Sequence, residues 1–170
     1  GMSYAGKRSM TVMKHVGLNV AADVFMNMSV SGVNGGLVVV VADDPSMHSS
    51  QNEQDSRYYG KFAMIPILEP SNQQECYEIT KYAFERSELY KLPGLIRLVT
   101  RLSHSRAGVV TTDTKGQNKI SLPTSPTQFQ LIPMHARGRY QSLLDSQPGI
   151  LEEAEKSPFN EFKKGPNTSM

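Results

Sequence analysis

The chain of 170 residues has one cysteine, no tryptophan and no long apolar run. The single cysteine, Cys76, excludes an internal disulfide and, within this chain, a cysteine-clustered zinc or iron–sulfur site. Such low cysteine usage favours a reducing, cytoplasmic location. The longest uncharged run, from Val24 to Ala42, is interrupted by asparagines, serines and glycines, so we expect no membrane span.

The chain also lacks a strong charge of either sign. Its 18 lysines and arginines face 16 aspartates and glutamates, which leaves a net charge of +2. A balance of this kind predicts neither a nucleic-acid partner nor a surface that attracts acidic substrates. The length and the ordinary apolar content predict one globular α/β domain over residues 3–156, followed by a linker-like tail at 157–170.

The most informative apolar segment is Leu37–Ala42, which reads LVVVVA. A strand that is apolar at every position is buried on both faces, as in a mostly parallel sheet flanked by helices. Other apolar runs predict strands at residues 10–16, 63–68, 95–102 and 129–133. Amphipathic spacing predicts a helix capped by Ser71 and another at 136–156 that breaks at Pro148-Gly149. Residues 107–128 have little periodicity and predict a surface loop or arm.

Polar clusters follow several of the predicted strands, where open parallel sheets bind their ligands. Lys14 and His15 could bind an anion or move a proton, or could form an ordinary solvated turn. Asn19 is interpreted as a helix cap, and Asn34 precedes two glycines in a tight turn. The long connection after Asp43-Asp44 is dense in hydrogen-bonding side chains, which favours a functional loop: His48, Ser49, Ser50, Gln51, Asn52 and Gln54.

Several chemistries have no support in the spacing of these residues. No G-x-G-x-x-G or Walker loop occurs, so the glycines before residue 37 do not predict a nucleotide site. Asp43, Asp44, His48 and Glu53 match no known metal-ligand spacing. A small hydrolase is disfavoured because the chain has no G-x-S-x-G elbow.

Three segments together carry a family resemblance: MKHVGLNVAAD at 13–23, GVNGG at 32–36 and VVVVADDPSMHSSQNEQDSR at 38–57. With FAMIPILEPSNQQE at 62–75 and RLVTRLSHSR at 97–106, they resemble the large, alpha subunit of indolepyruvate ferredoxin oxidoreductase. That family belongs to the thiamine-diphosphate-dependent 2-oxoacid:acceptor oxidoreductases. The resemblance extends over roughly residues 3–160.

The resemblance implies part of a pyrimidine-binding domain, an α/β fold that here lacks its first elements. It also implies a parent reaction in which aryl pyruvates are oxidatively decarboxylated with thiamine diphosphate and Mg. Electrons then pass through iron–sulfur clusters, held elsewhere in the complete enzyme, to ferredoxin. The activating glutamate of the family, its diphosphate motif and its cluster cysteines have no counterpart in this sequence. The expected partners are the remaining segments of the alpha subunit and a beta subunit.

On this resemblance, the expected cofactor-facing residues are Lys14, His15, Asn19, Asn34, His48, Ser49, Ser50, Gln51, Asn52 and Gln54. No residue is assigned a catalytic or metal-binding role. Two interpretations remain open: part of the oxidoreductase that is inactive as an isolated chain, or a non-catalytic α/β binding or subunit-interaction module derived from that domain. Because the fold would lack its first elements, self-association over exposed sheet surface is also expected.

Overall fold

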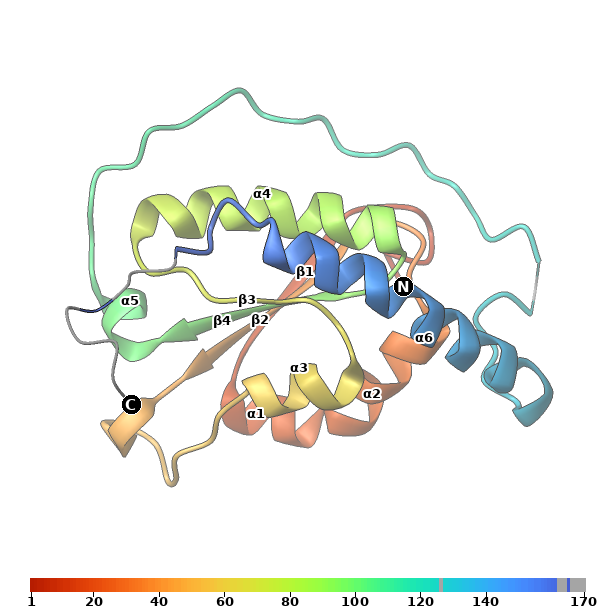
Figure 1. Ribbon diagram of the computed structural model, residues 1–170, viewed down its shortest axis with the longest axis horizontal. Coiled ribbons are helices and arrows are strands. Elements are labelled where there is room, and N and C mark those ends of the chain that lie inside the picture. The colour runs from red at the N-terminus through yellow and green to blue at the C-terminus, as the bar shows by residue number, and fades with distance from the viewer. Residues whose placement is uncertain (126, 162–164, 166–170) are drawn as a thin grey trace.

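The computed structural model describes residues 1–125, 127–161 and 165. A four-stranded sheet forms its centre, in the order β1-β2-β4-β3, and every neighbouring pair is parallel (Figure 1). The strands are β1 (Ser9–Lys14), β2 (Leu37–Asp43), β3 (Ile67–Leu68) and β4 (Gly94–Val99). Because all of them run the same way, their carboxyl ends meet at one edge of the sheet. The predicted α/β class with a parallel sheet is confirmed.

Helices cover both faces of the sheet. One face carries α1 (His15–Val20), α2 (Ala22–Ser31) and α3 (Arg57–Ala63), and the other carries α4 (Gln73–Tyr90). The short helices η1 (Pro45–Met47) and α5 (Thr100–His104) follow β2 and β4, and α6 (Pro133–Glu155) packs near β3, with contacts to α2 and α4.

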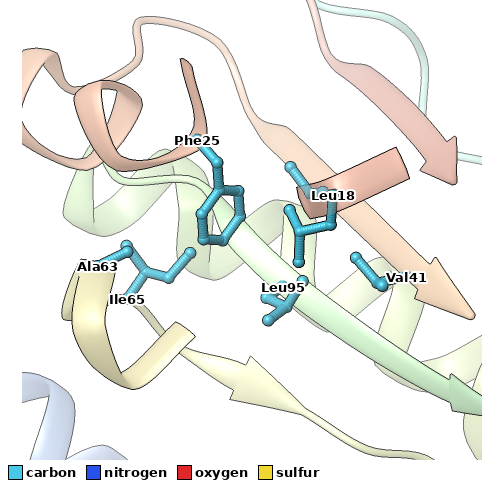
Figure 2. Packing of buried hydrophobic residues seen from close by; sticks show 7 residues of the cluster. Leu18, Phe25, Val41, Ala63, Ile65 and Leu95 are labelled. Atoms are coloured by element: carbon cyan, nitrogen blue, oxygen red, sulfur yellow. The ribbon is translucent and has the colours of Figure 1, made fainter. Parts of the chain in front are cut away.

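Strand β2 is the centre of two apolar cores, as its unbroken apolar sequence predicts. On one face, Val39 and Val41 pack with Leu18, Phe25 and Leu95 beneath α1, α2 and α3 (Figure 2). On the opposite face, Val38 and Val40 pack with a second group beneath α4: Ile79, Ala83 and Ile96. The alternation of side chains along a strand therefore buries both faces of β2.

Several predicted boundaries are wrong. The segment 63–68 contributes only the two-residue strand β3, because Ala63 ends α3 and Met64 takes a left-handed conformation. The strand at 95–102 ends at Val99, and α5 follows it. No strand forms at 129–133; Phe129 instead stacks on Tyr4, with ring centroids 4.0 Å apart.

The predicted helices at 71 onwards and at 136–156 form, but their caps and the predicted break differ. Asn72, rather than Ser71, caps α4 by accepting a hydrogen bond from the Glu75 N–H. Asn19 lies inside α1 and caps no helix. The final helix is continuous across Pro148 instead of breaking there. Tertiary contacts on both sides of the proline hold it, including Leu143 in the core and Glu153 against α4.

Residues 105–124 form neither helix nor strand and run as an extended arm along α4 (Figure 1). The arm is attached by polar side chains spaced three or four residues apart on α4. Gln74 exchanges two hydrogen bonds with the backbone of Val110, and Tyr77 does the same with Thr112. Farther along, the side chain of Asn118 donates to Glu88. In the part of the chain that is described, no helix is long and apolar enough to cross a membrane.

Candidate functional site at the carboxyl edge of the sheet

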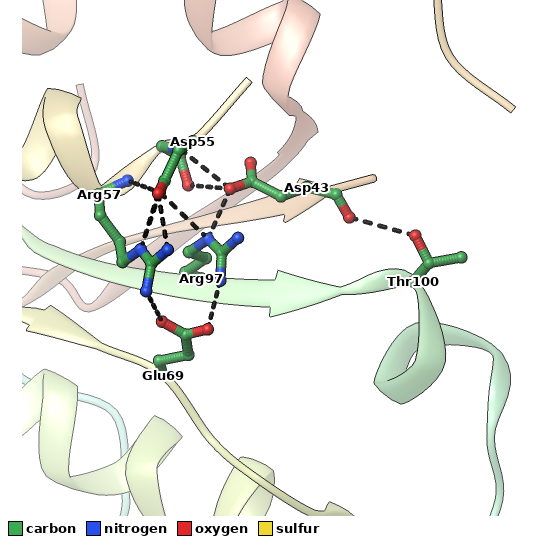
Figure 3. A network of polar contacts seen from close by, with 7 residues as sticks. Asp43, Asp55, Arg57, Glu69, Arg97 and Thr100 are labelled. Atoms are coloured by element: carbon green, nitrogen blue, oxygen red, sulfur yellow. Dashed lines mark hydrogen bonds and ion pairs between the residues drawn. The ribbon is translucent and has the colours of Figure 1, made fainter. Parts of the chain in front are cut away.

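An ionic network joins the carboxyl ends of three strands. Arg97 of β4 is 6% exposed, and its Nε donates to Asp43 Oδ2 at the end of β2 over 2.6 Å. The other end of the guanidinium binds Glu69, which directly follows β3, and Asp55 Oδ1 lies 3.6 Å from Arg97 Nε (Figure 3). Arg57 pairs with Asp55 over 2.7 Å. The network thus connects β2, β3, β4 and the start of α3.

The environment of Asp43 is almost closed to water. Its Oδ2 also accepts hydrogen bonds from the Ser56 N–H and Ser56 Oγ, at 2.9 and 3.0 Å. Among the described residues its Oδ1 has no hydrogen-bond partner. Buried carboxylates are stable only when charges and donors compensate them, so Arg97 and Ser56 together permit Asp43 to stay at this position.

Asp44 organises the loop that follows β2. Its carboxylate accepts hydrogen bonds from Ser50 Oγ and the Ser49 N–H, each at 2.7 Å, from Thr100 Oγ1 at 2.8 Å and from the His48 N–H at 3.2 Å. These bonds hold the pKa of Asp44 well below its usual range, and the bond from Ser50 has the largest effect. Asp44 therefore remains charged and ties the 48–50 loop to the first residue of α5.

A groove with a volume of about 780 Å³ lies beside this loop. Pro45, Ser46 and His48 form one wall, Val99 and Arg101 contribute from β4 and α5, and the segment after β3 completes it. The wall that follows β2 is a strained turn, since Ser46 and Met47 have φ values of 67° and 53°. Together with the hydrogen bonds to Asp44, this turn gives the groove a defined shape.

The structure brings together most of the residues that the sequence singled out. Lys14 Nζ donates to the Ser49 carbonyl over 2.7 Å, which joins the end of β1 to the loop after β2. Asn19 Oδ1 accepts a hydrogen bond from the Tyr59 hydroxyl on α3. Gln54 donates to the side chain of Asn52 over 3.0 Å. The predicted residue Gln51 is exposed in the same loop.

His15 and Asn34 differ from this group. His15 is 1% exposed, and neither ring nitrogen has a hydrogen-bond partner among the described residues. Asn34 precedes β2 and therefore lies at the opposite, amino edge of the sheet, where it donates to the carbonyls of Tyr4 and Ser121. The expectation that Asn34 shares an edge with the other residues is wrong, because a residue before a parallel strand cannot lie at its carboxyl end.

Arg97 and Glu69 belong to this edge but were not predicted from the sequence. Arg97 lies within the predicted strand 95–102, and a charged residue within an apolar strand is a signal for a buried ion pair. Glu69 gave no such signal, because its place at this edge depends on strand order. Within residues 1–125, 127–161 and 165, no group of three or more His, Cys, Asp or Glu side chains could hold a metal ion.

The fold is similar to that of a domain in a solved redox enzyme. The structure of 2-oxoglutarate:ferredoxin oxidoreductase from Magnetococcus marinus, with 2-oxoglutarate, coenzyme A and succinyl-CoA bound, matches with a TM-score of 0.60 at 16% sequence identity. The match covers 88% of this chain and 34% of that chain. The chain therefore has the α/β fold of a domain of the 2-oxoacid:ferredoxin oxidoreductases.

Sequence similarity is more specific. The indolepyruvate oxidoreductase subunit IorA of Pyrococcus abyssi is 51% identical over 164 residues, and that of Archaeoglobus fulgidus is 46% identical over 168 residues. The matches include 93% and 97% of this chain, but only 25% and 27% of those proteins. No family model matches the chain. The chain is thus a relative of the IorA subunits and spans about a quarter of their length.

Proposed function

We propose that this chain forms part of the large subunit of a thiamine-diphosphate-dependent indolepyruvate:ferredoxin oxidoreductase. In this role it would contribute the pyrimidine-facing wall of the cofactor site and have no activity as an isolated chain. The observation that carries the proposal is the identity of 45–51% with six IorA subunits over more than 90% of the chain. Identity of that extent is difficult to reconcile with a change of fold or of binding edge.

The residues of the carboxyl edge are compatible with the pyrimidine half of the cofactor. His15 has two buried ring nitrogens without partners among the described residues, and an aminopyrimidine offers both hydrogen-bond donors and acceptors. When bound, the cofactor supplies the carbanion stabilisation needed for decarboxylation of a 2-oxo acid. Lys14, Asn19 and the 48–54 loop would orient it and exclude water. Asn34 is not part of this proposal, because it lies at the other edge of the sheet.

Among the described residues no group of three or more His, Cys, Asp or Glu side chains could hold a metal ion, and we assign neither Mg nor the diphosphate to them. In the complete enzyme these would be held by the remaining segments of the alpha subunit, with iron–sulfur clusters elsewhere and a beta subunit as partner. Ferredoxin would be the electron acceptor, and the cytoplasm the site of action. Each of these assignments rests on the relation to the IorA subunits.

The open edge of the sheet supports a contact with further protein. Strand β1 pairs only with β2 among the described strands, and its side chains Met10 and Val12 are 42% and 66% exposed. Unpaired strand edges with apolar side chains favour association. We propose that remaining segments of the subunit cover this edge, and that a second copy covers it in the isolated chain. Light scattering of the purified chain tests the second statement, which a strictly monomeric solution would contradict.

A chimera tests the main proposal. The section of Pyrococcus abyssi IorA that matches this chain is replaced by residues 3–160, and the subunit is assembled with its natural partner. We expect coenzyme A-dependent reduction of an artificial acceptor by indolepyruvate at a rate within about tenfold of the parent enzyme. An assembled but inactive chimera would favour the alternative, a non-catalytic interaction module. The unaltered enzyme and a chimera without coenzyme A are the controls.

A further inference from the structure

A cavity of about 290 Å³ lies beside the edge strand β3, between this strand, α4 and α6. It shares no lining residue with the groove at the carboxyl edge, so the two are separate sites. Its walls are mostly apolar. The apolar surface comes from β3 and the residues before it, from the second half of α6 and from two rings of α4: Ile65, Ile67, Leu68, Ile150, Tyr82 and Tyr90.

A polar bridge between α4 and α6 forms one end of the cavity. Tyr82, Arg86 and Tyr90 occur at every fourth residue, so all three lie on one side of α4. The hydroxyl of Tyr82 donates to Glu153 Oε1 over 2.8 Å, and that of Tyr90 donates to Glu153 Oε2 over 2.6 Å. The Arg86 guanidinium forms an ion pair with the same carboxylate. Long side chains therefore join the two helices, and the apolar space lies beside them.

The polar end carries no net charge. Among the described residues that line the cavity, only Arg86 and Glu153 are charged, and they pair with each other. Burial, and after it the nearby carboxylate of Glu153, raises the pKa of both Tyr82 and Tyr90 to about 12, so the two phenols stay neutral. A charged ligand would enter this space without a counter-ion. The lining therefore favours a neutral ligand.

One buried donor of the lining has no partner. Among the described side chains around the cavity, Arg86 Nε is the buried polar atom without a hydrogen bond. Two contacts hold its guanidinium in place, the ion pair with Glu153 and the Tyr82 ring, whose centre lies 4.8 Å from Arg86 Cζ. The Tyr82 ring is itself fixed by Phe159, which packs edge-on against it. Because an unpaired buried N–H is unfavourable, a ligand with an oxygen acceptor would be stabilised here.

The volume of the cavity limits the size of the ligand. An apolar cavity of about 150 Å³ can stay dry and hold a benzene ring, and this cavity is about twice as large. We propose that it binds a small neutral aromatic molecule with one hydrogen-bond acceptor, such as an aryl ketone. The ring lies among the apolar side chains, and the oxygen accepts a hydrogen bond from Arg86 Nε. The cavity lies outside the carboxyl edge, so the proposal is independent of the proposed function.

Acetophenone and ethylbenzene test the proposal on the purified chain, because they are similar in shape and only acetophenone has an oxygen acceptor. The methyl NMR signals of Ile65 and Ile67, which line the cavity, report binding and give the dissociation constants. We expect acetophenone to bind with a dissociation constant of about 1 mM or lower. R86M should weaken acetophenone binding about tenfold relative to ethylbenzene, since only the ketone loses a hydrogen bond to a charged donor.

Two substitutions on α6 test the location. I150W extends a larger side chain from the wall of the cavity and should weaken the binding of both ligands about tenfold or more. The matched control is L151W, because Leu151 is the next residue of α6, is 64% exposed and does not line the cavity. It should leave both affinities unchanged. L68F fills the cavity from β3 instead and replaces I150W if that variant does not fold.

Four results would contradict the proposal in different ways. If neither compound binds the unaltered chain at millimolar concentration, water fills the cavity and the proposal is overturned. If I150W and L151W weaken binding equally, the ligand lies elsewhere. An unchanged ratio of the two affinities in R86M would overturn the role of Arg86 as donor. Benzoate that binds as tightly as acetophenone would overturn the assignment to a neutral ligand.

Discussion

Replacing Arg97 by methionine removes the central cation of the network at the carboxyl edge. The Asp43 side chain is 0% exposed and that of Arg97 is 7% exposed, so the substitution leaves a buried carboxylate without its counter-ion. Loss of one member of a buried pair typically costs about 3–5 kcal/mol, mainly through the uncompensated charge that remains. The Ser56 hydrogen bonds to Asp43 persist, which favours the lower half of this range.

The same network contains a matched control, Arg57. Its side chain is 55% exposed and pairs with Asp55 over 2.7 Å, so R57M deletes an ion pair that water screens and should cost about 0–1 kcal/mol. Urea unfolding of the two variants, compared at equal m-value, gives the difference between their unfolding free energies directly. A cost for R57M equal to or above that of R97M would refute the argument that burial, rather than the number of ion pairs, sets the energy.

Two further predictions concern packing and acid stability. A Cβ on Gly60 would lie 2.6 Å from Ile67 Cδ1 and 3.1 Å from Leu95 Cδ2, so G60A should lower the unfolding free energy by about 1–3 kcal/mol. The control is G108A, because Gly108 has open space around it and the substitution should leave the packing undisturbed. Thermal unfolding compares the two variants, and equal effects would contradict the packing argument. Hydrogen bonds from Arg8 lower the pKa of Glu88 from 4.5 to about 2, so its stabilising contribution is present above pH 4.5 and lost as the pH falls towards 2. The difference in stability between the unaltered chain and E88Q should therefore narrow from about pH 5 to about pH 2, and a constant difference would contradict this.

The sequence predicted those parts of the fold that depend on one segment at a time. The unbroken apolar run of β2 predicted burial on both faces, and amphipathic spacing predicted helix α4, whose Ile79 and Ala83 pack on the sheet. The predictions of secondary structure were wrong where tertiary contacts decide which element forms. Phe129 stacks on Tyr4 instead of entering a strand, and α6 continues through Pro148 because groups on both sides of it are held.

The candidate site was predictable to the extent that strand ends could be located. Lys14, His48 and Ser49 follow recognisable strands, so their meeting at one edge follows from parallel topology. The same reasoning misplaced Asn34, which precedes its strand. It could not find Glu69, because β3 lies beside β4 only in the observed strand order. Spatial neighbours that depend on strand order have no signature in local sequence.

The charges at this edge do not cancel, and the excess is negative. Asp43, Asp55 and Glu69 share two guanidiniums, those of Arg57 and Arg97, and Asp44 is held by uncharged hydrogen-bond donors rather than by a cation. Because neutral donors hold Asp44, the shape of the loop after β2 does not depend on a counter-ion. The edge can thus be rigid before any ligand arrives, which is the condition for selective binding by so few residues.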